Sequence, residues 1–310
     1  MDDDKGPLGV KVDAPDEYAP HILFPIPRAR GRHLLGLTDN NALPLPFVGE
    51  DVWNAYELSW LNGKGVPRRA CLVLRIPCTT PFLTESKSLK LYLNSLSFKR
   101  FSSSDELLKT IVLDVGRVLS GSEGKGAEEE EDAAAKASVS AELLAPGTEP
   151  PLLDASKWTC VDDEDIGDLD ESAFATPDAS HIKVVDASAS TAAATEERLL
   201  THLLRTLCPV TGQPDWGSVL VEYTMSSGSA IDRAGLLRYI VSLRREIGFH
   251  ENAIERIFLA IKERCGSALD GLRVTGRFFR RGGIDINPVR AFGTVQEAEG
   301  ATAQARVPGQ

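Results

Sequence analysis

A cysteine and a carboxylate seven residues apart are the pair in this chain that most clearly suggests catalysis. Cys208 and Asp215 bound a stretch in which Gly212 and Pro214 indicate a loop rather than a core element. A thiol in such a loop, next to a carboxylate that can exchange its proton, is typical of nucleophilic catalysis. The alternative is that Cys208 is a small buried apolar residue, the commonest role of a free cysteine.

Two further polar groups stand where helices are expected to begin. Glu251 in a first helical turn can simply complement the helix dipole, whereas His250 beside it, with an ordinary pKa of about 6.5, suits acid–base work. The run Glu85-Ser86-Lys87 is either a capped, charged first turn or an anion site formed by helix N–H groups and a lysine.

The basic run Arg280-Arg281-Gly282-Gly283 has two interpretations. It is either a charged surface turn or a phosphate site, in which glycines let the backbone approach and arginines clamp the anion. Neither GxGxxG nor a P-loop occurs, so no Rossmann or Walker site is expected. The five cysteines and five histidines lack zinc-ligand spacing, so we predict no metal site.

Composition limits the class of protein. The chain has 310 residues, of which 42% are hydrophobic and 25% charged, which fits two globular domains. A net charge of -11 argues against a general nucleic-acid binder. The odd number of cysteines indicates a reducing compartment, and no apolar run reaches membrane-spanning length. We therefore expect a cytoplasmic protein.

Apolar spacing predicts an alternation of strands and helices. The order strand, helices, strand occurs in both halves, which favours an α+β fold of two similar modules. The expected strands are 69–76, 218–224 and 272–279, and the expected helices are 86–96, 104–119, 196–207, 232–243 and 249–265. Residues 51–60 carry aromatics at a spacing that suits either a helix or a packed extended segment.

Composition also suggests the domain boundaries. We expect an extended N-terminal arm at 1–46, a first module at 47–119, an acidic disordered insertion at 120–151, a second module at 152–292 and a disordered tail at 293–310.

Four motifs in order carry a family resemblance. Residues 85–95, Cys208 with 213–217, residues 249–251 and residues 280–288 resemble the NADPH-dependent 7-cyano-7-deazaguanine reductases, the nitrile reductases of queuosine biosynthesis in tRNA, in their long two-module form. The resemblance implies tandem tunnelling-fold modules, each an antiparallel sheet with helices on one face. It also implies a homodimer that binds a small deazapurine substrate and touches neither nucleic acid nor membrane.

The resemblance implies a role for each motif residue. Cys208 would form a covalent thioimidate with the nitrile, and Asp215 and His250 would move protons. The residues implied to bind the substrate are Thr84, Glu85, Ser86, His250 and Glu251. The residues implied to hold NADPH are Ser86, Lys87, Arg281 and Gly282. Thr84 departs from the family pattern, which has an aliphatic residue there.

Three other functions fit parts of the pattern. A cyclohydrolase-like enzyme of the same fold would need zinc held by Cys and His. A non-catalytic purine- or pterin-binding protein would not need Cys208, Asp215 and His250 together. A Cys-His hydrolase would have no use for a cofactor loop.

Overall fold

The chain folds into two compact units. In the computed structural model the described residues are 14–37, 44–122, 124, 127–186, 195–226, 228–295, 305–308 and 310. The first unit comprises the described residues of 1–43 together with Glu50–Pro150 and Arg280–Asp285. The second comprises Pro44–Gly49, Pro151–Phe279 and the described residues of 286–310. The prediction placed residues 280–285 in the second module, whereas they pack with the first unit.

The sheet of the first unit is built on two long strands. β2 (Val48–Asn62), which belongs to this unit from residue 50, pairs antiparallel with β3 (Pro67–Pro77), and β3 pairs antiparallel with β6 (Ser140–Leu144). The short β5 (Arg100–Phe101) adds to β2 in parallel. Residues 51–60 are therefore strand, and Val52 and Trp53 lie in the core.

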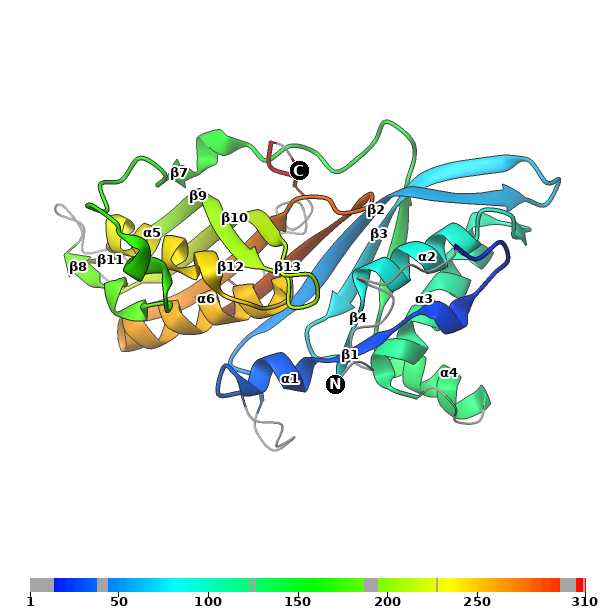
Figure 1. The fold of residues 1–310 in the computed structure, drawn as a ribbon, viewed down its shortest axis with the longest axis horizontal. Helices are drawn as coiled ribbons and strands as arrows, with labels where there is room; N and C mark the ends of the chain where they lie inside the picture. Colours follow the sequence, from blue (N-terminus) through cyan, green and yellow to red (C-terminus); the bar gives the residue numbers. More distant parts are fainter. Residues whose placement is uncertain are drawn as a thin grey trace. The chain divides into compact units, whose positions relative to one another are not determined.

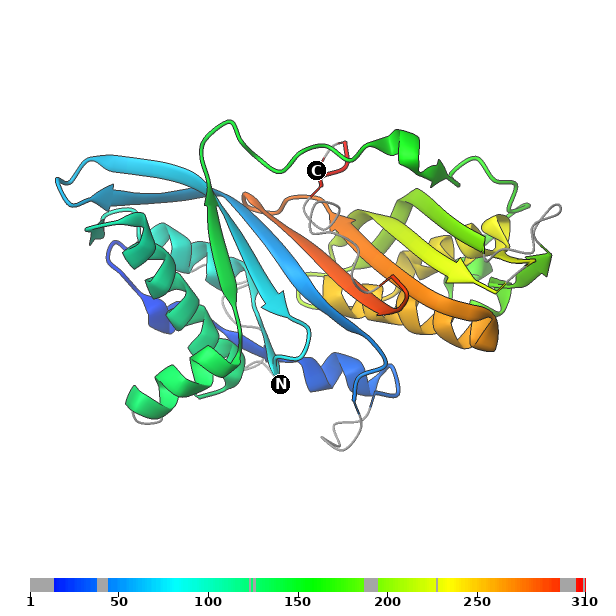
Figure 2. The same ribbon diagram turned by 180° about the vertical axis from the view of Figure 1, so that it is seen from behind.

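Two helices cover one face of this sheet, α2 (Ser86–Ser95) and α3 (Ser104–Ser120) (Figures 1 and 2). Their apolar stripes at i, i+3, i+4 spacing are buried, which confirms both predicted helices. Ser103 caps α3 by accepting a hydrogen bond from the backbone N–H of Glu106, and Gly121 ends it with a φ of +66°.

The N-terminal arm is folded onto the first unit. It contains η1 (Pro20–Ile22), β1 (Pro25–Pro27) and α1 (Arg28–His33), and β1 pairs antiparallel with β4 (Phe82–Thr84). The buried Arg28 donates to the buried Asp51 carboxylate at 2.6 Å. Residues 1–13 and 38–43 of the predicted arm lie outside the described residues. Within the described part, the arm is extended at β1 but helical at η1 and α1.

The insertion at 120–151 was predicted to be disordered, and that prediction is wrong for its described residues. Helix α4 (Ala127–Lys136) packs against α3, and β6 extends the sheet. Ala134 is 3% exposed, and a Cβ on Gly116 would lie 2.9 Å from its carbonyl oxygen, so two small residues allow the helices to touch. The glutamates fall in the first turn of α4, where they complement the helix dipole.

The second unit repeats the plan of the first. Its antiparallel strands run in the order β13 (Ile284–Gly293, from residue 286), β12 (Leu269–Phe278), β10 (Pro214–Met225) and β9 (Thr195–Leu207). Two helices cover one face of this sheet, α5 (Arg233–Ser242) and α6 (His250–Cys265), and they lie behind the strands in Figure 2. An antiparallel sheet with helices on one face thus occurs in both units, and the α+β prediction is confirmed.

Short elements complete the second unit. β7 (Thr159–Cys160) adds to β9 in parallel, and β8 (Val184–Asp186) pairs with β11 (Ser229–Ile231). The 3-10 turns are η2 (Ala155–Lys157), η3 (Glu171–Phe174), η4 (Ala179–His181), η5 (Leu243–Arg245) and η6 (Gly266–Ala268). Among the helices of the described ranges, none is long and apolar enough to cross a membrane.

The predicted helix at 196–207 is wrong, because these residues form strand β9. Its leucines stand at helical spacing, but the strand is partly covered on both faces and contains a bulge. Gly217 pairs with Leu204 and Val219 with Thr201, so two residues of β9 oppose the single Ser218. A bulge shifts the in–out alternation by one residue and hides the period of a strand.

The end of the tail is ordered, contrary to the prediction of disorder from 293. The Arg277 side chain, 1% exposed, donates through Nε to the Ala305 carbonyl at 2.7 Å. Gln310 donates through Nε2 to the Phe278 carbonyl at 3.2 Å, and Val307 packs with Leu200 and Leu220. Buried polar groups of the sheet thus find their partners in the tail.

Candidate active site

Cys208 lies in the tight turn that joins β9 to β10. Its backbone N–H donates to the Gln213 carbonyl at 2.9 Å, and its carbonyl accepts from the Gly212 N–H at 2.9 Å. Gly212 has a φ of +65°, which a glycine adopts without strain. Cys208 is 6% exposed. The thiol is therefore held by a closed turn at the end of two paired strands and not by an open loop.

Asp215 and His250 form a contact in the same unit. His250 Nε2 lies 3.5 Å from Asp215 Oδ1, and the two side chains are 12% and 4% exposed. Asp215 enters from the start of β10 and His250 from the first residue of α6. A shielded carboxylate–imidazole pair of this kind can pass a proton, since either group can hold one.

Phe278 supports the imidazole, a role that the sequence did not reveal. The rings of His250 and Phe278 are 4.0 Å apart between centroids and inclined by 34°. A Cβ on Gly217 would lie 3.1 Å from the Phe278 ring and 2.9 Å from the Arg277 carbonyl, so a glycine is needed where β10 meets β12. The only signal in the sequence was the glycine in the motif at 213–217.

Glu251 is buried in the first turn of α6, directly after His250. It is 3% exposed. A buried carboxylate needs donors around it, and the positive end of the helix favours its charge. Cys208, Asp215, His250 and Glu251 all belong to the second unit.

Glu85 in the first unit caps its own helix. Its carboxylate accepts from the backbone N–H of Lys87 at 2.8 Å and of Ser88 at 2.7 Å, and it is 2% exposed. Burial raises the pKa of Glu85, and the two backbone hydrogen bonds oppose that shift. Each carboxylate oxygen has a second acceptor position, so capping leaves capacity to bind a ligand.

The N-terminal arm braces this motif. The Glu85 N–H donates to the Phe24 carbonyl at 2.9 Å, and the Phe24 N–H donates to Ser88 Oγ at 3.0 Å. Thr84 is 3% exposed, and its hydroxyl has no hydrogen-bond partner among the described residues. The Thr84 hydroxyl is thus a buried polar atom that a ligand can satisfy.

The run Arg280–Gly283 leads into a two-residue β-turn. Arg281 and Ile284 exchange backbone hydrogen bonds of 2.8 and 3.0 Å, and φ is +58° at Gly282 and +80° at Gly283. Positive φ at both central residues suits a turn that joins paired strands. The predicted loop at 280–288 therefore ends early, because β13 begins at Ile284.

Lys90 joins the two groups of residues implied to hold the cofactor. From α2, one turn beyond Ser86 and Lys87, its Nζ donates to the Gly282 carbonyl at 2.5 Å and to Glu57 Oε2 at 3.1 Å. The start of α2 and the glycine turn are therefore linked within the first unit. Sequence spacing did not identify Lys90, because the two segments lie almost 200 residues apart.

Residues on β2 fix the base of the turn. Asp285 is fully buried and accepts from Asn54 Nδ2 at 2.7 Å and from the Tyr56 hydroxyl at 2.6 Å. The Arg280 guanidinium stacks 4.3 Å from the centroid of the Tyr56 ring. Two lysines and two arginines near glycine backbone and the start of a helix suit a phosphate-bearing cofactor such as NADPH.

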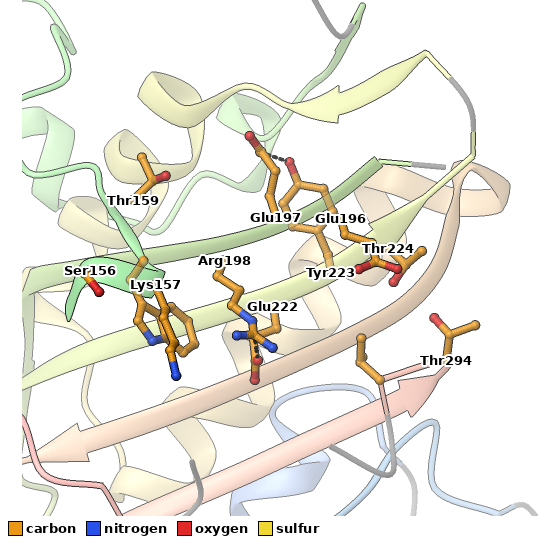
Figure 3. Close-up of a pocket in the computed structure, with 12 residues that line it drawn as sticks. Ser156, Lys157, Thr159, Glu196, Glu197, Arg198, Glu222, Tyr223, Thr224 and Thr294 are labelled. Carbon is orange, nitrogen blue, oxygen red and sulfur yellow. Dashed lines mark hydrogen bonds and ion pairs between the residues drawn. The ribbon is translucent and has the colours of Figure 1, made fainter. Parts of the chain in front are cut away.

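A separate cavity of about 640 Å³ in the second unit contains none of the predicted site residues (Figure 3). Several of its charged side chains are paired: Glu222 bonds Arg198 at 3.2 Å and Arg273 at 3.3 Å, and Glu197 accepts from the Tyr223 hydroxyl. Because none of the residues predicted for catalysis or for binding lines this cavity, we assign it no function.

The fold and the residues define a two-unit α+β protein with a buried thiol, carboxylate and imidazole in one unit and a basic glycine turn in the other. Residues 14–123 match the family described as "Nitrile reductase, 7-cyano-7-deazaguanine-reductase N-term", and residues 214–297 match "QueF-like protein".

Relatives match over nearly the whole chain. A Desulfotalea psychrophila protein named "NADPH-dependent 7-cyano-7-deazaguanine reductase" is 44% identical over 286 residues, which cover 92% of this chain and 91% of the relative. A protein of the same name from Azoarcus sp. is 43% identical over 295 residues, which cover 95% and 93%. The chain therefore belongs to the NADPH-dependent 7-cyano-7-deazaguanine reductase family, and it is an oxidoreductase.

One solved structure is also similar. It is titled "Crystal structure of the archaeosine synthase QueF-Like in the apo form", is 18% identical, and covers 34% of this chain and 99% of its own, with a TM-score of 0.29. That likeness is too low to bear on the fold or the site.

Proposed function

We propose that this protein reduces the nitrile of 7-cyano-7-deazaguanine to the aminomethyl group through a covalent thioimidate on Cys208. The observation that carries the proposal is the buried contact between Asp215 and His250, in the same unit as a thiol held by the β9–β10 turn. Membership of the reductase family supplies the substrate and the cofactor, since the relatives are named for both.

The first step joins sulfur to the nitrile carbon. Asp215 takes the proton of the Cys208 thiol, and the thiolate adds to the carbon. The same proton goes to the nitrile nitrogen, so a C–S bond forms, the C≡N bond becomes C=N–H, and no charge is left over. The Asp215–His250 contact keeps the carboxylate oriented for both transfers.

The later steps need protons and a closed site. When bound, NADPH supplies a hydride to the carbon in each of two rounds. After the first, the C–S bond breaks and an imine remains. The Cys208 thiolate then takes up a proton that comes from solvent through Asp215, which restores the thiol. His250 donates the second proton to the imine nitrogen, which yields the amine. His250 lies on the ring of Phe278, which holds the imidazole in one orientation for this transfer.

Carboxylates recognise the base. A deazaguanine presents ring N–H and amino donors, which Glu251 and Glu85 accept, and Thr84, Ser86 and His250 complete the substrate contacts. Both carboxylates are almost fully buried, so a base with acceptors in these positions would place acceptor against acceptor without water between them.

The cofactor phosphates are assigned to the first unit. Lys87 and Arg281 supply charge, the Ser86 hydroxyl supplies a donor, and Gly282 allows the backbone to approach. Lys90 supports this assignment, because its bond to the Gly282 carbonyl links the turn to α2. The homodimer, the cytoplasmic location and the lack of direct contact with nucleic acid stay predictions.

The stoichiometry of NADPH oxidation tests this function. With a known, limiting amount of 7-cyano-7-deazaguanine, we expect two NADPH to be oxidised for each nitrile. The loss of NADPH absorbance measures this number. Consumption of no NADPH, or of one per nitrile with the imine as the end product, would overturn the proposed reaction. Guanine, which lacks the nitrile, serves as the control substrate and leaves NADPH unchanged.

A further inference from the structure

A thiol, a carboxylate and an imidazole converge at the β7 edge of the second unit, outside the proposed active site. One ligand atom from each of Cys160, Asp162 and His202 lies within 4.8 Å of the other two. Cys160 and His202 are exposed, and Asp162 is half-buried. The sequence did not predict this cluster, because Cys160 and His202 are 42 residues apart.

Strand pairing brings these residues together. β7 lies parallel to β9 with Cys160 opposite Leu200, and His202 is two residues further along β9. The His202 N–H donates to both oxygens of Asp162, at 3.1 and 3.2 Å. The carboxylate is therefore oriented by backbone and does not depend on a flexible contact.

The bulge in β9 aims the imidazole. His202 and Leu203 are the two residues that oppose Ser218, and both are exposed. Bulges often redirect a side chain in this way. His202 Nδ1 lies 2.7 Å from Ser218 Oγ, and Ser218 is 2% exposed. A hydroxyl that binds one ring nitrogen leaves Nε2 as the ligand atom and fixes the ring, as the hydrogen-bond partners of metal-bound histidines do.

We propose that Cys160, Asp162 and His202 bind a zinc-class divalent cation. Thiolate, imidazole and carboxylate together suit Zn²⁺ or Co²⁺, whereas Mg²⁺ and Ca²⁺ prefer oxygen ligands alone. Three protein ligands on an exposed edge leave the fourth tetrahedral position to water. Binding displaces the proton of the Cys160 thiol, which leaves with the solvent.

This site is independent of the proposed reaction. Cys208 lies six residues beyond His202, just past the end of β9, which is about 20 Å of extended chain. The cation would instead fasten β7, a two-residue strand, to the edge of the sheet. It therefore acts on stability and does not take part in hydride or proton transfer.

Cobalt titration of the full chain tests the proposal. The titration is done on a Cys208→Ala background, so that the active-site thiol does not contribute. We expect one Co²⁺ per chain with a thiolate-to-cobalt charge-transfer band. The band is absent in Cys160→Ser, Co²⁺ binds at least tenfold more weakly to His202→Gln, and binding by Asp163→Asn, whose exposed carboxylate is the matched control, is unchanged.

Ser218→Ala measures the positioning role of the hydroxyl. Loss of the hydrogen-bond partner of a metal-bound histidine typically weakens metal binding by about 10–100-fold, and the charge-transfer band at saturation is retained. A shift of the melting temperature by Zn²⁺ in the parent chain, absent in Cys160→Ser, gives a second readout. The proposal is overturned if no Co²⁺ binds, if the band persists in Cys160→Ser, or if all variants bind equally.

Discussion

At the scale of single residues, the proposed chemistry depends on buried side chains that can each hold or release a proton. Asp215 and His250 are 4% and 12% exposed and in contact. Water competes weakly for groups in such a place, so proton transfer between them and a bound substrate needs little reorganisation.

Replacement of Asp215 by asparagine tests its role as proton carrier. The amide keeps the shape but cannot take the thiol proton, so we expect kcat to fall by roughly 10²–10⁴-fold while the fold is retained. The measurement is steady-state NADPH oxidation, with Asp270→Asn on the exposed end of β12 as the matched control. An Asp215→Asn enzyme with the kcat of the control would contradict the assignment.

Glu85 makes stability depend on pH. Burial raises the pKa of its carboxyl in the folded state above the ordinary value of 4.5, so the folded state holds this proton more tightly than the unfolded state. The contribution of protonated Glu85 to the free energy of unfolding is therefore fully present below pH 4.5. It is lost as pH rises through the raised pKa of the folded state.

The wild-type chain should thus lose stability relative to Glu85→Gln as pH rises through this window, and the difference should become constant above it. Urea unfolding at several values between about pH 4 and pH 7 measures the difference. Glu142→Gln, on the exposed face of β6, is the control. A wild-type to Glu85→Gln difference that does not change with pH would show that Glu85 carries no such shift.

At the scale of elements, the three predicted strands correspond to β3, β10 and β12, and four of the five predicted helices exist. α2 and α3 have one buried stripe and clear caps, so spacing identified them. The prediction of a helix for β9 was wrong because the bulge at His202–Leu203 and the coverage on two faces removed the alternation of the strand. Pairing with β10 outweighed the helical propensity of its leucines, glutamates and arginines.

The glycine turn offers a test of the cofactor site. An alanine at Gly283, where φ is +80°, costs about 1–2 kcal/mol of stability, and its Cβ would lie 2.5 Å from Glu57 Cδ. Glu57 would move and give up its ion pair with Lys90, which also holds Gly282. We therefore expect a higher KM for NADPH in Gly283→Ala.

Gly36→Ala is the matched control for this change. Gly36 has a φ of +72°, and a Cβ at this position would meet no described atom within 4 Å, so the substitution carries the same backbone cost without displacing a side chain. Urea unfolding should show comparable losses for both variants. Equal KM values for NADPH in the two variants would contradict a role of the glycine turn in cofactor binding.

At the scale of the whole molecule, each unit contains a segment that is distant in sequence from the rest of that unit. The first unit takes Arg280–Asp285, and the second takes the described end of the tail. The four motifs could be found by resemblance, because they are short and local. Phe278, Lys90 and the cluster at Cys160 could not, because their roles arise only from strand pairing and packing.

Deletion of residues 305–310 tests the contribution of the tail. It removes the carbonyl that accepts from the buried Arg277, which costs about 1–3 kcal/mol when nothing replaces it. It also exposes the apolar cluster that Val307 covers, which adds about 1.5–3 kcal/mol. We expect a lower midpoint of urea unfolding, with a smaller loss in Val307→Ala. An unchanged midpoint would mean that the tail does not stabilise the second unit.

The most direct test of the proposed function is the intact mass of the protein after mixing with 7-cyano-7-deazaguanine in the absence of NADPH. The proposal predicts one adduct with the mass of the whole substrate, because addition of the Cys208 thiol to the nitrile loses no atoms. The adduct disappears when NADPH is added, and Cys208→Ala forms none. Absence of the adduct in the wild-type protein, or its persistence in Cys208→Ala, would contradict a covalent thioimidate on Cys208.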